Sequence, residues 1–176
     1  MTVEIYALSV LQRGPVHGYE LKNRIRRPSI APVNNNSLYP ALKRLERDGA
    51  VTKTVEQQEG RPARNVYAIT ESGRRLLRDL VSSLPRELAS DDEEFLLRVS
   101  FFDDLDVPAR LGVLATRREV VEQALAQVRG LLAEPPSGGM PGPARTWRRR
   151  AQEQLVDRLT QELRWLDELR AEAARP

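Results

Sequence analysis

The hydrophobic positions in residues 34–70 follow two different periods, which predict a short helix and then a β-hairpin. Leu38, Leu42 and Leu45 recur three and four residues apart, so they form the buried face of a helix. Farther along, apolar and polar residues alternate on both sides of Glu59-Gly60-Arg61-Pro62, a sequence typical of a turn. This segment therefore predicts one helix followed directly by a two-stranded ribbon.

The ends of this helix are also marked in the sequence. Tyr39-Pro40 lies early in the helical pattern, and proline fits without loss only in the first turn of a helix. We therefore expect the helix to begin near Ser37 or Leu38, with Ser37 as its N-cap and its free amides placed to bind a phosphate. Gly49 is the expected C-cap, and Thr70 is the expected N-cap of the next helix.

Two further helical patterns precede this segment. Ile5 and Leu8 lie at near-helical spacing, and Gly14-Pro15 ends their helix. A second helix opens within residues 17–22, and prolines stop it before the third. The order helix, break, helix, loop, helix and hairpin is that of a winged helix-turn-helix.

The polar residues on and around the third helix are of the types that bind nucleic acid. Asn and Arg side chains can read base edges, while Lys, Ser and Tyr reach phosphates. Lys43 is by geometry the better phosphate ligand and Arg44 the better guanine ligand, unless either pairs with a neighbouring acid. The asparagines could instead only supply the turn conformation, and Tyr39 could pack in the core. The hairpin arginines could lie in a solvated loop rather than bind at a minor groove. The candidate DNA-binding residues are Tyr19, Asn35, Asn36, Ser37, Tyr39, Pro40, Lys43, Arg44, Arg61 and Arg64.

The second half of the chain is helical in pattern. Two long apolar stripes flank residues 134–143, a Pro- and Gly-rich flexible loop, so we expect an antiparallel helix pair. The stripes either pack against the first domain or bury against a second copy; we favour the second copy, because major-groove readers commonly act as two-fold dimers. The predicted dimerisation residues are Ile5, Leu8, Val156, Leu159, Leu163 and Leu166.

The fold class expected for the whole chain is mainly α with a small β-hairpin. We divide it into an N-terminal winged helix-turn-helix for DNA binding, residues 1–84, and a C-terminal antiparallel helical dimerisation domain, residues 85–176. Charge follows the same division. Residues 1–80 carry 14 Lys and Arg against 8 Asp and Glu, giving +6, whereas residues 81–176 carry 14 against 17, giving −3. The basic half is the half with the predicted DNA-reading helix.

Composition excludes several other classes of protein. The chain has no cysteine, so a disulfide framework and a thiolate metal site are excluded. It shows no secretory signal and no apolar run of membrane-spanning length, so we expect a cytoplasmic protein without membrane contact. His17 is the only histidine, and metal binding or catalysis would need partners that are missing. We therefore expect neither an enzyme nor a cofactor, and His17 is expected to cap or orient the second helix.

Aromatic residues in the second half offer one further candidate site. Trp147, Trp165 and Phe102 could line a pocket for a planar effector at a helical interface. Packing in the core is the more common role of such residues, and it is the interpretation we favour.

The first half of the chain resembles the PadR family of transcriptional regulators. The resemblance is carried by Gly14-Pro15 with His17–Leu21, by Ser37–Leu42 with Arg44-Leu45-Glu46 and Gly49, and by Gly60-Arg61-Pro62, Tyr67 and Thr70–Gly73. These pieces cover about residues 5–75, in order and at the family's spacing. The helical second half is similar to that of the longer PadR subgroup, whose C-terminal helices mediate dimerisation.

This resemblance implies a winged-helix dimer, usually a repressor and often released by a small molecule. It places the recognition helix on residues 37–47 and the wing tip on residues 60–64. Family members commonly carry an aromatic or basic residue after the Arg-Pro of the wing, where this chain has Ala63, so the wing contact is expected to be weaker or shifted.

The leading hypothesis is a homodimeric repressor that binds a palindromic operator. Its expected partners are double-stranded DNA, a second copy of the chain and possible small aromatic or hydrophobic effectors. One alternative is a protein-interaction module or scaffold without sequence-specific DNA binding. Another is a regulator without a ligand, whose abundance alone controls transcription.

Overall fold

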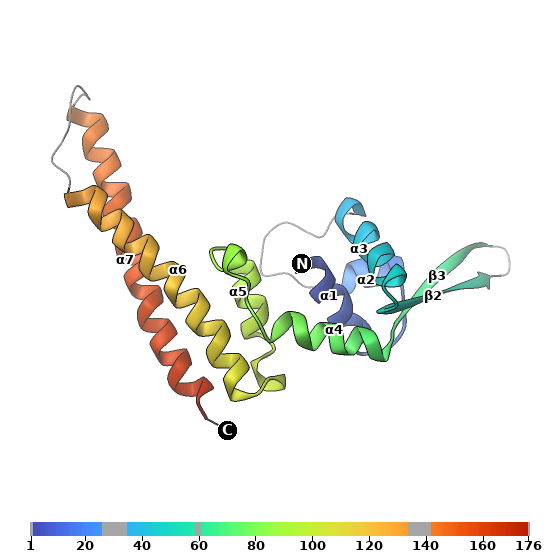
Figure 1. Cartoon of the computed structure of the whole chain (residues 1–176). Coiled ribbons are helices and arrows are strands. Elements are labelled where there is room, and N and C mark those ends of the chain that lie inside the picture. The colour runs from blue at the N-terminus through green and yellow to red at the C-terminus, as the bar shows by residue number, and fades with distance from the viewer. Residues whose placement is uncertain (1, 26–34, 59–60, 134–141, 176) are drawn as a thin grey trace. The chain divides into compact units, whose positions relative to one another are not determined.

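The computed structural model describes residues 2–25, 35–58, 61–133 and 142–175. The chain is mainly helical with one small antiparallel sheet, as Figure 1 shows. It forms two compact units, each built from two segments of the chain. The first unit comprises Met1–Ser83 with Leu96–Phe101, and the second comprises Leu84–Phe95 with Phe102–Pro176.

The first unit is a winged helix-turn-helix, in the element order that the sequence predicts. Its sheet has one more strand than expected, because β1 pairs antiparallel with β3 in the order β1-β3-β2. A strand of two residues is too short to show an alternating pattern, so hydrophobic periodicity does not predict it. The elements are α1 (Thr2–Leu11), β1 (Val16–His17), α2 (Gly18–Arg24), α3 (Asn35–Arg47), β2 (Val51–Gln58), β3 (Arg61–Ile69) and α4 (Glu71–Val81).

The core of the first unit lies where α1 packs against α3 and α4. Ile5 and Leu8 have no exposed surface there. These two side chains were predicted at a dimer interface, and that assignment is corrected. They are covered within a single chain, because α1 is enclosed by helices that follow it in the sequence.

Helix α3 begins earlier than expected, and this corrects a second prediction. It already includes Asn35, so Ser37 is its third residue rather than its N-cap, and Pro40 lies in the second turn. The helix tolerates this proline because Asn36 and Pro40 are both exposed. Water can therefore satisfy the carbonyl of Asn36, which lacks an N–H partner four residues later.

The connection from α3 to the sheet and on to α4 is built as expected. Gly49 ends α3 with a φ of +70°, and the Ala50 amide donates to the Leu45 carbonyl at 2.8 Å. The Thr70 hydroxyl caps α4 by accepting from the Gly73 amide at 3.0 Å and also donates to the Gly49 carbonyl at 2.7 Å. One threonine thus joins the end of α3 to the start of α4.

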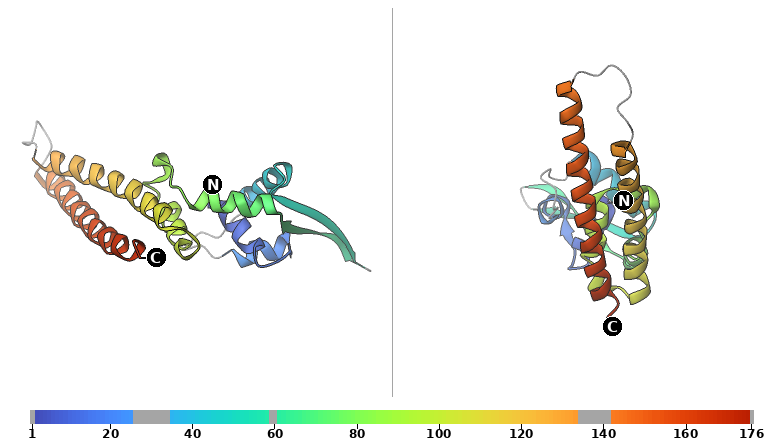
Figure 2. Two further views of the ribbon diagram at one scale, coloured as in Figure 1. Left: turned by 60° about the horizontal axis from the view of Figure 1, so that its bottom comes forward. Right: turned by 90° about the vertical axis from the view of Figure 1, so that its left-hand side faces the viewer.

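The second unit is dominated by two long antiparallel helices that lie side by side in Figures 1 and 2. The predicted helix pair is therefore confirmed; most of its predicted flexible loop, residues 134–141, lies outside the described residues. The elements are η1 (Arg86–Leu88), α5 (Asp92–Val99, whose last residues belong to the first unit), η2 (Phe102–Asp104), α6 (Val107–Ala133) and α7 (Gly142–Ala173).

The packing of α6 against α7 covers part of the predicted dimer interface. Leu159 and Leu166 are buried within one chain, while Val156 and Leu163 remain partly exposed. The single chain thus already satisfies half of the α7 stripe that we assigned to a second copy, and the dimerisation role of these residues stays a prediction.

A buried arginine fixes the interior of the second unit. The Arg117 side chain on α6 is 4% exposed and donates to the Ala89 carbonyl at 2.7 Å and the Asp92 carboxylate at 2.6 Å. It also donates to Glu162 of α7 at 2.6 Å, and its guanidinium lies 5.2 Å from the centre of the Phe95 ring. Arg117 therefore links four separate segments, which a hydrophobicity pattern cannot reveal.

Candidate nucleic-acid interface

Helix α3 has one buried apolar face and one exposed polar face. Leu38, Leu42 and Leu45 are buried, as the sequence predicts. On the opposite side, exposed residues follow one another four, three and four positions apart, so they form one line along the helix. They are Asn36, Pro40, Lys43 and Arg47, with Asn35 and Tyr39 exposed beside them and Ser37 partly exposed.

Lys43 is the free cation of this line. It is exposed, and within the described residues it takes part in no hydrogen bond or ion pair. A lysine with three donors and no partner can reach a phosphate without first losing an interaction.

Arg44 lies on the flank of the helix and is already occupied. Its Nε and Nη2 both donate to Oε1 of Glu4 on α1, at 3.0 and 2.9 Å. The sequence predicts Arg44 as a guanine-reading residue, with a pair to a neighbouring acid as the alternative. The actual partner lies 40 residues away in the sequence, so only the tertiary structure reveals it.

Arg47, which was not among the candidate residues, extends the exposed line of α3. It donates to the carboxylate of the adjacent Asp48 at 2.8 Å. This hydrogen bond lowers the pKa of Asp48 below its ordinary value and raises the pKa of Arg47. Both side chains are well exposed, so the pair is a surface interaction that solvent screens.

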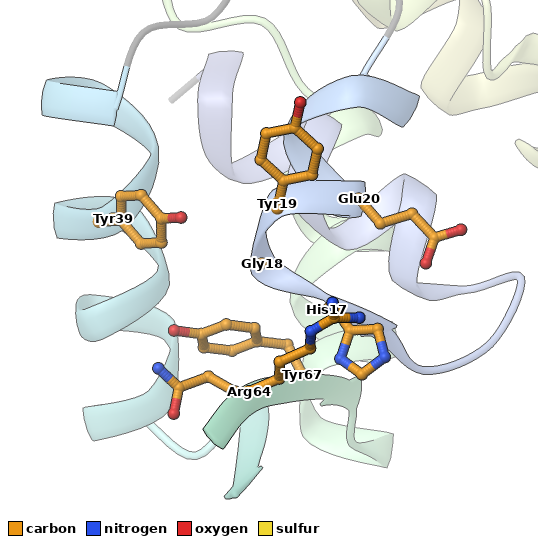
Figure 3. A pocket seen from close by; sticks show the side chains of 8 residues that line it. His17, Gly18, Tyr19, Glu20, Tyr39, Arg64 and Tyr67 are labelled. Carbon is orange, nitrogen blue, oxygen red and sulfur yellow. The ribbon is translucent and has the colours of Figure 1, made fainter. Parts of the chain in front are cut away.

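A cavity of about 340 Å³ opens beside this helix, where α2, α3 and β3 meet. Figure 3 shows Tyr39 reaching toward it from α3 and Tyr67 from β3, with Gly18 between them. A Cβ atom on Gly18 would come within 3.2 Å of the Tyr67 ring and 3.4 Å of the Tyr39 ring, so glycine allows both rings to approach. The lining residues are His17, Gly18, Tyr19, Glu20, Tyr39, Arg64, Asn65 and Tyr67.

The tyrosines of this cavity differ in exposure. Tyr19 is 75% exposed and Tyr39 is 41% exposed, whereas Tyr67 is 5% exposed. Burial raises the pKa of Tyr67, and the nearby Glu46 carboxylate adds to this effect. The Tyr67 hydroxyl therefore stays protonated and can donate a hydrogen bond over a wide range of pH.

The wing contributes one of its two predicted arginines to the described site. Arg64 is exposed and lines the cavity, together with Asn65, which the sequence analysis did not select. Arg61 pairs through its backbone with Gln58 at the end of the ribbon, and its side chain lies outside the described residues.

His17 joins this site through its place in β1. Its Nε2 lies 3.9 Å from Oε2 of Glu56 on β2, and its Nδ1 is buried without a hydrogen-bond partner among the described residues. His17 precedes α2 in the N-cap position but makes no side-chain hydrogen bond to that helix. The expectation that it caps α2 is therefore corrected, because its ring turns toward the sheet.

The predicted aromatic effector pocket does not form within one chain. Trp165 packs edge to face on Phe95, with ring centres 5.9 Å apart, whereas Trp147 is 69% exposed beside Arg150. The two tryptophans are 18 residues apart on one helix, about 27 Å at 1.5 Å per residue. Phe102 is half-buried in η2, so the three rings do not share a pocket.

Two other kinds of site are absent from the described ranges. No helix there is long and apolar enough to cross a membrane. In the same residues, no three His, Cys, Asp or Glu side chains gather in a way that could hold a metal ion.

Comparison with known proteins gives a match for each half of the chain. Residues 7–79 match the model of the transcriptional regulator PadR-like family. Residues 93–173 match the model of the virulence activator alpha C-terminal region.

The individual proteins that are similar to this chain share only a minor part of its sequence. A 37.1 kDa protein in transposon TN4556 of Streptomyces fradiae is 33% identical over 108 residues, which are 58% of this chain and 29% of that protein. The chain thus covers less than a third of the length of that curated relative. Bacillus subtilis PadR, solved with operator DNA, is 18% identical over 98% of this chain and 99% of that one, with a TM-score of 0.43. Its structure with p-coumaric acid is 18% identical over 99% of this chain and 100% of that one, with a TM-score of 0.39.

Proposed function

The chain belongs to the PadR-like family of transcriptional regulators, and from this premise we propose that it acts as a homodimeric repressor on a palindromic DNA operator. In this proposal α3 of each copy enters the major groove of one half-site. The β2–β3 ribbon acts as the wing and follows the backbone or the minor groove. A small effector releases the protein from DNA.

The observation that carries the proposal is the exposed line of α3. Its leucines are fixed in the core, so the helix cannot turn this line away from solvent. Asn35 and Asn36 offer amide groups that suit adenine, and Lys43 offers a free ammonium group that suits phosphate. A rigid helix that exposes amides and a free cation meets the requirements of a major-groove reader.

The cavity beside α3 supports a backbone contact. Arg64 supplies a guanidinium at its wall, while Tyr39 and Tyr67 supply hydroxyl donors from two different elements. Such a set of donors suits the oxygens of a phosphate. We assign this cavity to one phosphate of the strand that passes between α3 and the wing.

Two features of the second unit support the proposed dimer and the proposed effector. Leu131 of α6 and Trp147 of α7 are 49% and 69% exposed near the helix ends that residues 134–141 connect, which leaves apolar surface for a second copy. A cavity of about 450 Å³ lies along α6 and α7, with Leu114 and Leu166 in its wall and Arg118 and Arg170 beside them. This lining suits a small aromatic or hydrophobic acid better than Trp147, Trp165 and Phe102 do, because those three rings share no pocket.

The test measures the binding of labelled duplex DNA from upstream of the chain's own coding region by fluorescence anisotropy over a range of salt. Lys43→Ala should weaken binding and reduce the slope of log affinity against log salt by about 0.9, the value for one lost phosphate contact. Arg75→Ala is the matched control, because it removes one exposed cation from α4 rather than from α3. Footprinting of the same DNA should show a protected inverted repeat.

Equal affinity and equal salt slope for Lys43→Ala and Arg75→Ala would contradict the placement of α3. A single protected half-site, or a protein that remains monomeric at the concentrations used, would contradict the two-fold arrangement.

A further inference from the structure

Two of the three cations on α3 are bound by acids of the same chain. Glu4 accepts two hydrogen bonds from Arg44 on a single oxygen, and Asp48 pairs with Arg47. Lys43 alone among the three has no ion pair within the described residues. The positive charge of the helix is therefore mostly balanced before DNA arrives.

The two side chains of the Glu4–Arg44 pair differ in their exposure to solvent. The Glu4 side chain is 20% exposed and lies in the first turn of α1, next to the fully buried Ile5. The packing of α1 on α3 thus holds this carboxylate in place beside the helix. The Arg44 side chain is 50% exposed, so its remaining N–H groups face solvent.

A carboxylate and a phosphate offer arginine the same kind of ligand, a pair of charged oxygen acceptors. Glu4 therefore occupies the position on Arg44 that a phosphate of DNA would take. To bind that phosphate through Nε and Nη2, the two donors that Glu4 engages, Arg44 must first leave two hydrogen bonds of normal length. A neutral pair also contributes nothing to the release of counterions from DNA.

We propose that Glu4 withholds Arg44 from the DNA backbone and so lowers the affinity of α3 for DNA of any sequence. This inference rests on the proposed function, because it concerns the same helix. Discrimination depends on the ratio between specific and non-specific affinity. A backbone contact is common to both complexes, so withholding it weakens binding to every duplex and leaves that ratio unchanged.

The experiment compares the full chain with Glu4→Gln, which preserves the size of the side chain and removes its charge. Anisotropy is measured with a random-sequence duplex and with the upstream DNA, over a tenfold range of salt. Glu4→Gln should bind the random duplex more tightly than the wild type, with a salt slope steeper by about 0.9. As salt rises tenfold, the affinity of Glu4→Gln relative to that of the wild type should fall about eightfold, which is the same slope expressed as a ratio. The preference for upstream over random DNA should stay the same, because both duplexes gain the same backbone contact.

Two controls separate this effect from general charge and from misfolding. Glu71→Gln removes an acid from the first turn of α4, which gives the same net charge without freeing a cation on α3. The double variant Glu4→Gln with Arg44→Gln should lose the gain, because the freed guanidinium is gone. Thermal unfolding of each variant verifies that α1 still packs on α3.

If Glu4→Gln equals Glu71→Gln in affinity and slope for the random duplex, or if the double variant keeps the gain, the inference is overturned. The proposed function fails by a different result, namely a wild type without preference for its upstream DNA. The random-duplex comparison still decides the role of Glu4 in that case, since it requires only a polyanion.

Discussion

Arg44 and Arg47 of α3 differ sharply in their surroundings from Arg117 of α6. In the first unit Arg44 and Arg47 lie at the surface, and each pairs with one acid. In the second unit Arg117 is buried and bonds to a carbonyl and to two carboxylates. A surface pair is worth little free energy and can exchange one anion for another, whereas a buried arginine that loses its partners leaves charges that water cannot reach.

This difference separates the adaptable part of the molecule from its fixed part. The charges of α3 can be redistributed when another anion replaces Glu4 or Asp48, because solvent already screens them. The charges around Arg117 hold α5, α6 and α7 together in one arrangement. The exposed face of α3 is thus suited to exchange its ionic partners, and the cluster around Arg117 is suited to maintain a shape.

The strongest test of this contrast is Arg117→Met. Removing the guanidinium leaves Glu162 and the Ala89 carbonyl without their donor, so the free energy of unfolding should fall by about 3 kcal/mol. Arg118→Met is the control on the same helix, because Arg118 is partly exposed and pairs with Glu122 and Asp167. It should lose less than about 1 kcal/mol. Urea unfolding followed by circular dichroism measures both, and equal losses would remove the distinction between buried and surface arginines.

The next largest effect is expected at a glycine of the first unit. Gly73 lies so close to the Ala50 carbonyl that an added Cβ would overlap its oxygen and press on Ile69. Gly73→Ala should therefore destabilise the protein by about 1–3 kcal/mol through overpacking. Gly112→Ala is the control in α6, where nothing lies within 4 Å of the added atom, and it should stabilise by up to about 1 kcal/mol. Thermal unfolding distinguishes them, and a stable Gly73→Ala protein would show that the corner between β2 and α4 is loose.

A smaller loss is expected at the cap of α4. Thr70→Ala removes the acceptor of the Gly73 amide and the donor to the Gly49 carbonyl, which should lower the free energy of unfolding by about 1 kcal/mol. Thr116→Ala removes a threonine that bonds only to its own helix at Gly112, so it should change stability by less than about 0.5 kcal/mol. Urea unfolding of both variants checks this order, and the reverse order would exclude a capping role for Thr70.

The smallest effect should appear only at alkaline pH. Burial raises the pKa of Tyr67 in the folded chain, so the unfolded chain releases this proton first. The stability from neutral Tyr67 is complete below about pH 10, the ordinary tyrosine pKa, and is lost as pH rises through the folded value. Tyr67→Phe should therefore lose stability less steeply than the wild type above about pH 10. Tyr19→Phe removes a hydroxyl from an exposed ring and serves as the control in urea unfolding across this range; identical slopes for both variants would contradict the effect of burial.

The elements of the fold could be predicted because each has a local signal. Leu38, Leu42 and Leu45 gave α3, and Gly49 and Thr70 marked its end and the next start. The signals failed where local rules compete. Pro40 predicts a later start of α3 than the structure has, because proline is expected only in the first turn of a helix. This expectation leaves out that the turn is exposed, so that water can replace the lost hydrogen bond.

The position of the candidate site could be predicted from the sequence, but the contacts between its residues could not. The exposed face of α3 follows from its period alone, so Tyr39 and Lys43 were correctly placed at the surface. The cavity around Gly18 and Tyr67 was missed, because it needs β1, which left no pattern in the sequence.

By itself, the sequence determined the helices, the hairpin and the polar face of the reading helix, because side-chain period is a local property of the backbone. Only the tertiary structure decided which charges meet. Glu4 and Arg44 are 40 residues apart, and Arg117 and Glu162 are 45 residues apart. Such pairs depend on how helices pack, and packing brings together residues whose separation along the chain carries no periodic signal.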